Sequence, residues 1–340
     1  MRAVLVSKHG DEGVLVLADR ETPAAGPGQI LVQVKAAGVN FADVLARLGV
    51  YKAAPKPPFI PGIEVAGTVL ACGQDVSRFK PGARVMAFCP FGGYAEAVAV
   101  PEHYAFSIPD DMLFAEAAAL PVQYLTAYHG LFNLAHLRAG ETVLVHAAAG
   151  GVGIAALQLC RHAGAKVVAT VGSAAKVPVV EAECPGARVV VTSQEDFERA
   201  VREETAGRGA DVIMDSLGGR AFRKGWRVLA PAGRHVLFGA AGAVRPGAIY
   251  RLAALWRLAP MLFVATLPMI SENKSLSGFN LFFLAGRDDL LRAAAHLLEL
   301  RAEGKIKPRV SLSLPLEKAA EAHWRMQNRE TTGKVVLTVS

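Results

Sequence analysis

The first third of the chain alternates short apolar runs with glycine and proline. Runs of roughly four to eight residues bounded by such breakers are typical of β-strands. Strands are predicted at Arg2–Ser7, Val14–Leu17, Ile30–Ala37, within residues 62–73 and at Arg84–Phe88. A proline-rich loop occupies Pro55–Pro61. Because many short strands with glycine-containing turns are typical of closed sheets, this segment predicts a small β-barrel.

A different pattern begins at Phe114. Phe114–Leu134 has the length and apolar density of a helix, and four apolar strands follow with helical segments between most of them. These strands are Thr142–His146, Lys166–Val171, Asp211–Asp215 and His235–Phe238. Alternating strands and helices predict a doubly wound parallel sheet. Ligands bind at the carboxyl ends of such strands, so the loops Ser216–Gly219 and Phe238–Gly242 are predicted to line a cofactor crevice.

The last third contains the most apolar stretch of the chain, Leu252–Ile270. Arg257, Pro260 and Pro268 interrupt it, whereas a membrane-spanning helix needs about 20 apolar residues without such breaks. We therefore expect no integral membrane segment; residues 248–270 could instead form an interfacial helix, a lid over the substrate or packing at a dimer edge. Further elements are predicted as helices at Asp288–Arg301 and Glu317–Gln327 and a final strand at Lys334–Val339, which returns to the first domain.

A glycine-rich turn follows the strand Thr142–His146. The helix predicted at Gly151–Ala163 would direct its free N–H groups back at this turn, and helix N-termini bind phosphate in this way. In the dinucleotide-binding frame G-x-G-x-x-G, Ala148 stands in the first position, with Gly150 and Gly153 in the others. Although one glycine is missing, the place of the turn between strand and helix supports a dinucleotide site. The pyrophosphate is assigned to the backbone of Ala149, Gly150, Gly151 and Val152.

The end of the next strand favours NADPH over NADH. An NAD site places Asp or Glu about 20 residues after the glycines, where it binds the ribose 2′-OH. No acidic residue occurs between Gly153 and Glu181. Instead the strand leads into Gly172, Ser173 and Lys176, which offer a hydroxyl and a cation to a 2′-phosphate. Taken alone, Lys176 would be an ordinary solvated lysine at a helix start.

Composition excludes several other classes. A chain of 340 residues with 52% hydrophobic residues suffices for two domains. The net charge is +7, but no run of Lys and Arg exceeds two residues and the aromatic residues are dispersed, so we expect no nucleic-acid partner. The four cysteines share no C-x-x-C spacing and the N-terminus has no apolar signal segment, so a reduced, cytoplasmic protein is predicted. His129, His136 and His146 follow no metal-binding pattern and are predicted to be ordinary packed or surface residues.

Six stretches spread along nearly the whole chain resemble one family. They are VNFADVLARLGVY, PFIPGIEVAGTV, ALPVQYLTAYHGL, VLVHAAAGGVGIAALQL, ADVIMDSLGG and TTGKVVL. The chain resembles the medium-chain dehydrogenase/reductase superfamily, in its zinc-free NADPH:quinone oxidoreductase branch, and NKSLSGFNL and GKIKP are similar to the vesicle amine transport protein-like group. The resemblance implies an α/β fold with a GroES-like β-barrel domain at residues 1–122, a Rossmann NADPH domain at 123–265 and a return to the barrel domain at 266–340. It also implies an active site in the cleft between the domains and a homodimer.

Zinc-dependent members of this superfamily carry a cysteine near the position of Asn40 and a histidine at that of Ile63. Amide and aliphatic side chains cannot replace thiolate and imidazole as zinc ligands, and Glu64 alone does not make a site. Without a Lewis acid, the localised alkoxide from a simple ketone is poorly stabilised. Hydride addition to a quinone or to a conjugated carbonyl compound gives a delocalised anion instead, which requires only orientation, hydrogen-bond donors and one proton.

The resemblance also assigns residues to this chemistry. Asn40 would face the cleft and hydrogen-bond the substrate or the nicotinamide ribose, unless it only caps a turn. Tyr51 would donate a hydrogen bond or a proton to the developing anion, unless it only shapes the pocket wall. Asp43 is predicted to be structural. Further cofactor contacts are implied at Thr126, Phe238, Gly239, Phe279, Arg329 and Lys334.

We therefore predict an NADPH-dependent oxidoreductase that reduces quinones or α,β-unsaturated carbonyl compounds without a metal. One rival is an enoyl-thioester reductase of a polyketide or fatty-acyl pathway, whose acidic carrier the positive net charge would permit. Another is a non-catalytic nucleotide-binding, membrane-peripheral protein, in which residues 248–270 would be the interaction surface.

Overall fold

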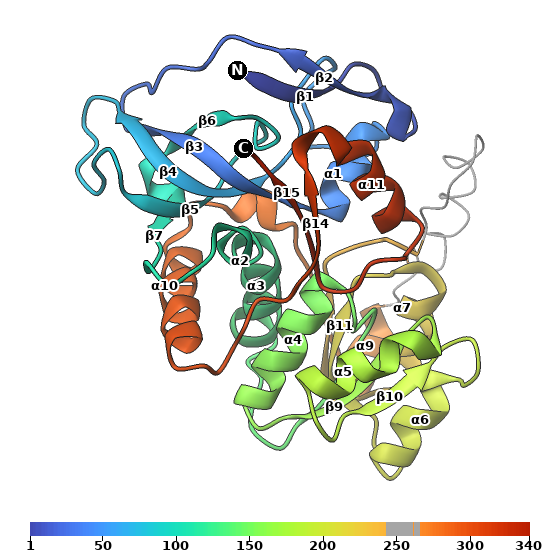
Figure 1. Cartoon of the computed structure of the whole chain (residues 1–340). Helices are drawn as coiled ribbons and strands as arrows, with labels where there is room; N and C mark the ends of the chain where they lie inside the picture. Colours follow the sequence, from blue (N-terminus) through green and yellow to red (C-terminus); the bar gives the residue numbers. More distant parts are fainter. Residues whose placement is uncertain (243–260, 262–265) are drawn as a thin grey trace. The chain divides into compact units, whose positions relative to one another are not determined.

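The structure, a computed structural model, describes residues 1–242, Met261 and residues 266–340. These residues form two compact units, each with its own sheet (Figure 1). Unit 1 contains Met1–Leu125, Leu281–Glu303 and Pro308–Ser340, and unit 2 contains Thr126–Asn280 and Gly304–Lys307. Most of the apolar stretch 248–270 lies outside the described residues, and the part within them does not decide between the three roles considered for it.

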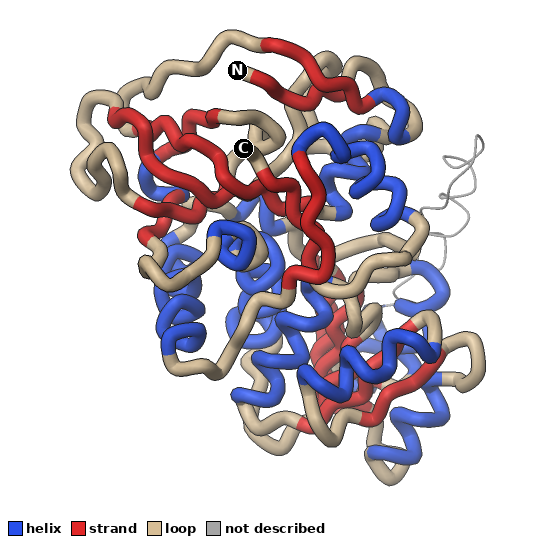
Figure 2. The backbone as a smooth tube through the Cα atoms, in the orientation of Figure 1, coloured by secondary structure: helices blue, strands red, loops and turns tan. Residues whose placement is uncertain are grey.

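Unit 1 is built on a seven-stranded sheet, drawn in red in Figure 2. The strand order is β14-β15-β3-β4-β5-β7, and β6 pairs with β3. The strands are β3 (Gln29–Val39), β4 (Glu64–Cys72), β5 (Arg84–Phe88), β6 (Ala97–Pro101), β7 (Ala105–Ser107), β14 (Val310–Pro315) and β15 (Lys334–Thr338), with a separate hairpin of β1 (Arg2–Val6) and β2 (Leu15–Asp19). β15 pairs antiparallel with β3, so that Val336 lies opposite Gly38. The last strand thus closes a sheet that the first third of the chain begins, as the sequence predicts.

The helical segment predicted at Phe114–Leu134 is interrupted. It forms α2 (Phe114–Ala117), α3 (Pro121–Tyr128) and a π-helical turn at His129–Leu134. The break falls at Pro121 because proline has no amide hydrogen and disfavours helical geometry in the residue before it. Of this segment only Phe114–Leu125 belong to unit 1, whose other α-helices are α1 (Phe41–Arg47), α10 (Asp288–Ala302) and α11 (Ala319–Gln327).

Unit 2 contains a six-stranded parallel sheet of order β10-β9-β8-β11-β12-β13. Its strands are β8 (Thr142–Val145), β9 (Lys166–Val171), β10 (Arg188–Val191), β11 (Ala210–Asp215), β12 (Leu229–Leu237) and β13 (Ser275–Gly278). The helices are α4 (Gly151–His162), α5 (Val177–Glu183), α6 (Phe197–Glu204), α7 (Gly219–Arg227) and α9 (Thr266–Glu272). The strand order reverses between β8 and β11, which is where doubly wound sheets bind their ligands. The predicted fold class is confirmed.

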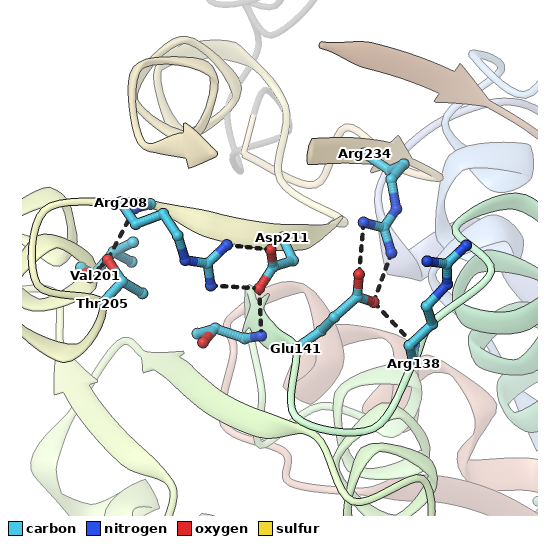
Figure 3. Close-up of polar contacts among 9 residues, drawn as sticks. Arg138, Glu141, Val201, Thr205, Arg208, Asp211 and Arg234 are labelled. Atoms are coloured by element: carbon cyan, nitrogen blue, oxygen red, sulfur yellow. Dashed lines mark hydrogen bonds and ion pairs between the residues drawn. The ribbon is translucent and has the colours of Figure 1, made fainter. Parts of the chain in front are cut away.

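Paired charges join the amino-terminal ends of β8 and β11 in unit 2 (Figure 3). The Asp211 carboxylate accepts from Thr142 N at 2.8 Å and from both terminal nitrogens of Arg208. Glu141 accepts from the two terminal nitrogens of Arg234 at 2.9 and 2.7 Å. These partners satisfy the charged groups at this edge of the sheet, whereas the opposite edge carries the loops predicted to bind a cofactor.

Among the residues that the structure describes, no helix has both the length and the apolar character needed to cross a membrane.

Candidate functional site

The turn after β8 is shaped to receive an anion. Ala147 adopts φ 51°, a left-handed conformation that is unusual for a residue with a side chain. Gly150 N donates to Ala147 O at 2.8 Å, and α4 begins at the next residue, Gly151. A Cβ on Gly153 would lie 2.5 Å from Ala147 O and 2.6 Å from Ala148 O, so glycine is required for α4 to approach the turn this closely. The N–H groups of the first turn of α4 lack partners within the helix and are available to a phosphate.

The missing first glycine of the fingerprint has a local explanation. The left-handed residue of the bend is Ala147 rather than Ala148, which therefore does not need to be glycine. Ala148 N donates to Thr170 O at 2.9 Å, which ties the turn to β9. Of the residues assigned to the pyrophosphate, Ala149 is buried, whereas Gly150, Gly151 and Val152 are half-buried.

The segment assigned to the 2′-phosphate lies at the carboxyl end of β9. Gly172 and Ser173 are exposed directly after the strand. Lys176 is half-buried at the end of a single 3-10 turn, Ala174–Lys176. The three residues thus share one edge of the sheet with the turn after β8.

The loops after β11 and β12 are bonded to each other. Phe238 N donates to Asp215 O and Ala241 N donates to Ser216 O, both at 3.0 Å. A Cβ on Gly239 would lie 2.8 Å from Ser216 O, so the close approach of the two loops depends on that glycine. Both predicted crevice loops therefore belong to one connected surface at the carboxyl edge.

Aromatic side chains gather beside these loops. Phe279, which follows β13, has its ring centroid 6.1 Å from that of Phe238 and 4.8 Å from that of His129. Thr126 is buried in α3, about one helical turn before His129. Sequence reasoning named Thr126, Phe238 and Phe279 but treated His129 as an ordinary residue, because nothing in the local pattern links it to Phe279.

In unit 1, Asn40 belongs to a buried polar cluster with Glu64 and Lys334. Asn40 Nδ2 donates to Glu64 Oε1 at 2.8 Å, and Lys334 Nζ donates to Asn40 Oδ1 at 2.8 Å and to Glu64 Oε1. Asn40 is 6% exposed, and Glu64 and Lys334 are 0% exposed. Sequence reasoning gave Glu64 no role and placed Lys334 beside the cofactor; their side chains lie together with that of Asn40.

The cluster fixes the orientation of the Asn40 amide. A flipped amide would set its NH₂ group against the Lys334 ammonium and its oxygen against the Glu64 carboxylate, and both contacts would be repulsive. Nδ2 also donates to Gly38 O at 3.3 Å, so both amide protons are engaged. Oδ1 accepts from the Lys334 ammonium, and Asn40 is also the N-cap residue of α1.

These side chains do not fit a zinc ion. Ile63 is 3% exposed and apolar, and Asn40 presents an amide where zinc would need a thiolate or imidazole. The remaining carboxylate, Glu64, is already paired with the Lys334 ammonium, which a metal cation would have to displace. Within residues 1–242, 261 and 266–340, no group of three or more His, Cys, Asp and Glu side chains is arranged to hold a metal ion.

Asp43 contacts the cluster of Asn40, Glu64 and Lys334 through the backbone of Asn40. Its carboxylate accepts from Asn40 N at 2.8 Å, from Gly62 N at 3.2 Å and from the Tyr94 hydroxyl at 3.2 Å. Burial outweighs these donors and raises the pKa of Asp43 to about 7. The Tyr94 hydroxyl also lies 3.1 Å from His323 Nε2, and burial lowers the pKa of that histidine to about 3. The contact with Asn40 N agrees with the structural role predicted for Asp43.

The two remaining predicted residues, Tyr51 and Arg329, also belong to unit 1. Tyr51 is half-buried, and its ring meets Phe282 edge-on at 6.1 Å within an aromatic and aliphatic cluster. Arg329 is exposed after α11 with φ 62°.

Known protein families match both parts of the chain. Residues 26–110 match the alcohol dehydrogenase GroES-like domain, and residues 186–337 match the zinc-binding dehydrogenase family. The synaptic vesicle membrane protein VAT-1 homolog of Rattus norvegicus is 40% identical over 341 residues, covering 99% of this chain and 84% of that protein. The quinone oxidoreductase of Lama guanicoe is 33% identical over 341 residues, covering 99% of this chain and 97% of that protein.

The solved structures that this chain resembles include proteins of the same two kinds. The Escherichia coli quinone oxidoreductase complexed with NADPH superimposes with a TM-score of 0.88 at 29% identity, covering 99% of this chain and 100% of that one. The human synaptic vesicle membrane protein VAT-1 homolog-like protein gives a TM-score of 0.86 at 34% identity, covering 100% and 98%. The chain therefore belongs to the medium-chain dehydrogenase/reductase family of oxidoreductases, in its quinone oxidoreductase-like branch near the VAT-1 proteins.

Proposed function

We propose that this protein is an NADPH-dependent oxidoreductase that delivers hydride, without zinc, to a quinone or to the C=C bond of an α,β-unsaturated carbonyl compound. One observation carries the proposal: an anion-binding turn after β8 stands beside a β9 end that offers Ser173 and Lys176 and no acidic residue before Glu181. The NADPH complex of the Escherichia coli quinone oxidoreductase, whose fold this chain shares, supports the choice of cofactor.

The proposed cofactor site belongs to unit 2. The backbone of Ala149, Gly150, Gly151 and Val152 would bind the pyrophosphate, and Gly172, Ser173 and Lys176 the 2′-phosphate. Thr126, Phe238, Gly239 and Phe279 would contact the nicotinamide half. When bound, NADPH supplies a hydride from C4 of its nicotinamide ring.

The residues of unit 1 would orient the reactants and supply the proton. The Asn40 amide would hydrogen-bond the nicotinamide ribose or the substrate, while the Lys334 ammonium holds the amide in place. Tyr51 would donate a hydrogen bond or a proton to the developing anion. Arg329 is proposed as a neighbour of the cofactor on the C-terminal side.

The side chains of Asn40 and Ile63, which do not fit zinc, support the proposed substrate class. A quinone or enone spreads the negative charge of the reduced product over several atoms, so positioned donors suffice. A simple ketone would concentrate that charge on one oxygen.

We also propose that the protein works as a homodimer in the cytoplasm. Molar-mass measurement and cell fractionation would test the two parts of this proposal.

A panel of acceptors tests the proposal. NADPH oxidation would be followed with a quinone, an enal, a cyclic enone, a crotonyl thioester and a saturated ketone, each with and without a chelator. Turnover of the quinone or enone, no turnover of the saturated ketone and no effect of the chelator are expected. Preference for the crotonyl thioester would favour an enoyl-thioester reductase. NADPH binding without any turnover would reject the oxidoreductase proposal.

A second candidate, peripheral membrane binding, is favoured by one observation. On α9 the side chains of Leu267 and Ile270 are 77% and 73% exposed, respectively. Cosedimentation with anionic liposomes tests it: a protein with both residues changed to Ser should bind less, and equal binding by the two proteins would reject this role.

A further inference from the structure

Four polar side chains form a row across four neighbouring strands of unit 2, just below the carboxyl edge of the sheet. They are Thr170 on β9, His146 directly after β8, Asp215 on β11 and His235 on β12. The register sets them on one face, because Leu144 pairs with both Val168 and Ile213 and Ile213 pairs with His235. All four are at most 2% exposed. Asp215 pairs with Leu237, so His235 lies one step lower than the other three side chains, level with the apolar residues Leu144, Val168 and Ile213 of the same face.

The row consists of two hydrogen-bonded pairs. His146 Nδ1 lies 3.1 Å from Thr170 Oγ1, and His235 Nε2 lies 3.1 Å from Asp215 Oδ2. Aromatic rings enclose both histidines: Phe197 lies 4.9 Å from His146 and Phe222 4.7 Å from His235, measured between ring centroids. Burying a polar group among aromatic rings costs free energy unless the group is hydrogen-bonded.

The bonds of Asp215 extend from the row to a loop. While Oδ2 faces His235, Oδ1 accepts from Leu217 N at 2.8 Å and from Gly218 N at 2.9 Å. Burial acts to raise the pKa of Asp215, but the hydrogen bond to His235, the nearby histidines and the Gly218 amide hold it below its usual range. The carboxylate is therefore ionised, and its bonds to the two amides are charge-assisted.

The loop that Asp215 holds has an unusual backbone. Gly218 and Gly219 both adopt the left-handed region, with φ 64° and 59°. Because glycine visits many conformations at similar cost, two such residues do not define a loop on their own. The carboxylate supplies the missing constraint at Leu217 and Gly218.

The Thr170–His146 pair lies next to the turn after β8. Thr170 holds His146 through its hydroxyl and accepts from Ala148 N through its carbonyl oxygen at 2.9 Å. Ala148 belongs to the turn assigned to the pyrophosphate. Each pair therefore supports one of the two loops that flank the reversal of strand order between β8 and β11.

We propose that Asp215 and His235 are positioning residues for the nicotinamide half of the cofactor: His235 fixes the Asp215 carboxylate, and the carboxylate holds the Leu217 and Gly218 amides. The inference rests on the proposed NADPH-binding function. In a doubly wound sheet the two halves of a dinucleotide lie on either side of the strand reversal. The loop after β11 therefore serves the half opposite to the 2′-phosphate.

His235→Phe and His235→Gln separate this role from simple packing. Phenylalanine keeps an aromatic ring beside Phe222 but removes the bond to Asp215, whereas the amide of glutamine can still donate to it. In cofactor-free protein, hydrogen exchange of the Leu217 and Gly218 amides should accelerate in His235→Phe and remain near wild type in His235→Gln. Unchanged exchange in His235→Phe would overturn the inference whether or not NADPH binds.

Affinities give the second measurement. If the competent loop conformation falls to about a tenth of the population, the dissociation constant for NADPH rises about tenfold. Adenosine 2′,5′-bisphosphate, which lacks the nicotinamide half, should bind His235→Phe and wild type within about twofold. Equal losses for both ligands, or none, would overturn the inference. Failure of the wild type to bind NADPH would instead reject the proposed function, and the exchange measurement would still judge the inference.

Two control variants bracket the result. Thr170→Val removes the hydroxyl that holds His146 next to the pyrophosphate turn and should weaken both ligands together. Ile213→Val lies on the same face of β11 and should lower the melting temperature without changing the ratio of the two affinities. If Ile213→Val shifts that ratio as much as His235→Phe, loss of packing explains the effect and the inference fails. Should His235→Phe not fold, His235→Leu, which also lacks the donor, replaces it under the same criteria.

Discussion

The Lys334 ammonium is the cation of a fully buried ion pair, and its removal should be costly. In Lys334→Met the Glu64 carboxylate keeps two donors, Asn40 Nδ2 and Val122 N, each at 2.8 Å, but loses the only cation that the structure gives it among the described residues. Breaking one side of a buried pair typically costs about 3–5 kcal/mol. Asn40 Oδ1 loses its donor in the same change.

Calorimetry measures this cost directly. For a domain of the size of unit 1, a loss of about 3–5 kcal/mol corresponds to a fall in melting temperature of roughly 10 °C. The double variant Glu64→Gln with Lys334→Met should recover most of the loss, because it leaves no uncompensated charge in the interior. A double-mutant cycle then isolates the interaction of the two side chains.

An exposed ion pair of the same unit provides the control. Arg325 and Glu321 on α11 are 42% and 34% exposed at 2.6 Å, and Arg325→Met should cost no more than about 0.5 kcal/mol. The reasoning is refuted if Lys334→Met costs as little as this control, or if the double variant is less stable than Lys334→Met.

Three further predictions concern the cofactor, the proton and pH. Lys176→Ala should raise the dissociation constant for NADPH about tenfold and leave that for NADH unchanged, whereas equal losses would contradict the 2′-phosphate assignment. Tyr51→Phe should lower kcat by roughly a hundredfold with unchanged NADPH affinity, and an unaltered kcat would remove its donor role. Burial lowers the pKa of His146 from 6.5 to about 4. The unfolded chain therefore binds a proton below pH 6.5 that the folded protein does not bind until about pH 4. The free energy of unfolding of unit 2 should fall by roughly 3 kcal/mol between these two pH values. Urea midpoints measured across this range should depend less on pH in His146→Gln, and an identical dependence would show that other groups dominate.

The fold was largely predictable because its signals are local. Apolar runs between glycine and proline gave the strands of both units, and the alternation with helices gave the parallel sheet. β6, β7, β10 and β13 were not predicted, and in β13 Ser275 and Ser277 interrupt any apolar pattern. The interruption at Pro121 shows how one missing amide hydrogen divides a segment of uniform apolar character.

Only part of the candidate site was predictable. Some of its contacts join residues that are close in the sequence, whereas others join residues that are far apart. The turn after β8 depends on close backbone contacts within a few residues, which demand glycine at position 153 and leave a trace in the sequence. Glu64 and Lys334 are 270 residues apart, and neither position signals the other. The Asp215–His235 pair depends on the register of β11 against β12, which no local pattern specifies.

The arrangement of segments in unit 1 sets an order of events during synthesis. Unit 2 comes almost entirely from one stretch, whereas unit 1 needs β14 and β15 from its last segment. A ribosome therefore synthesises all of unit 2 before it adds Lys334, and until then the Glu64 carboxylate lacks the ammonium group with which it is paired in the interior. Domains usually fold in the order in which they emerge from the ribosome. Here unit 1 begins to emerge first, but it can complete its sheet only after unit 2 has been synthesised.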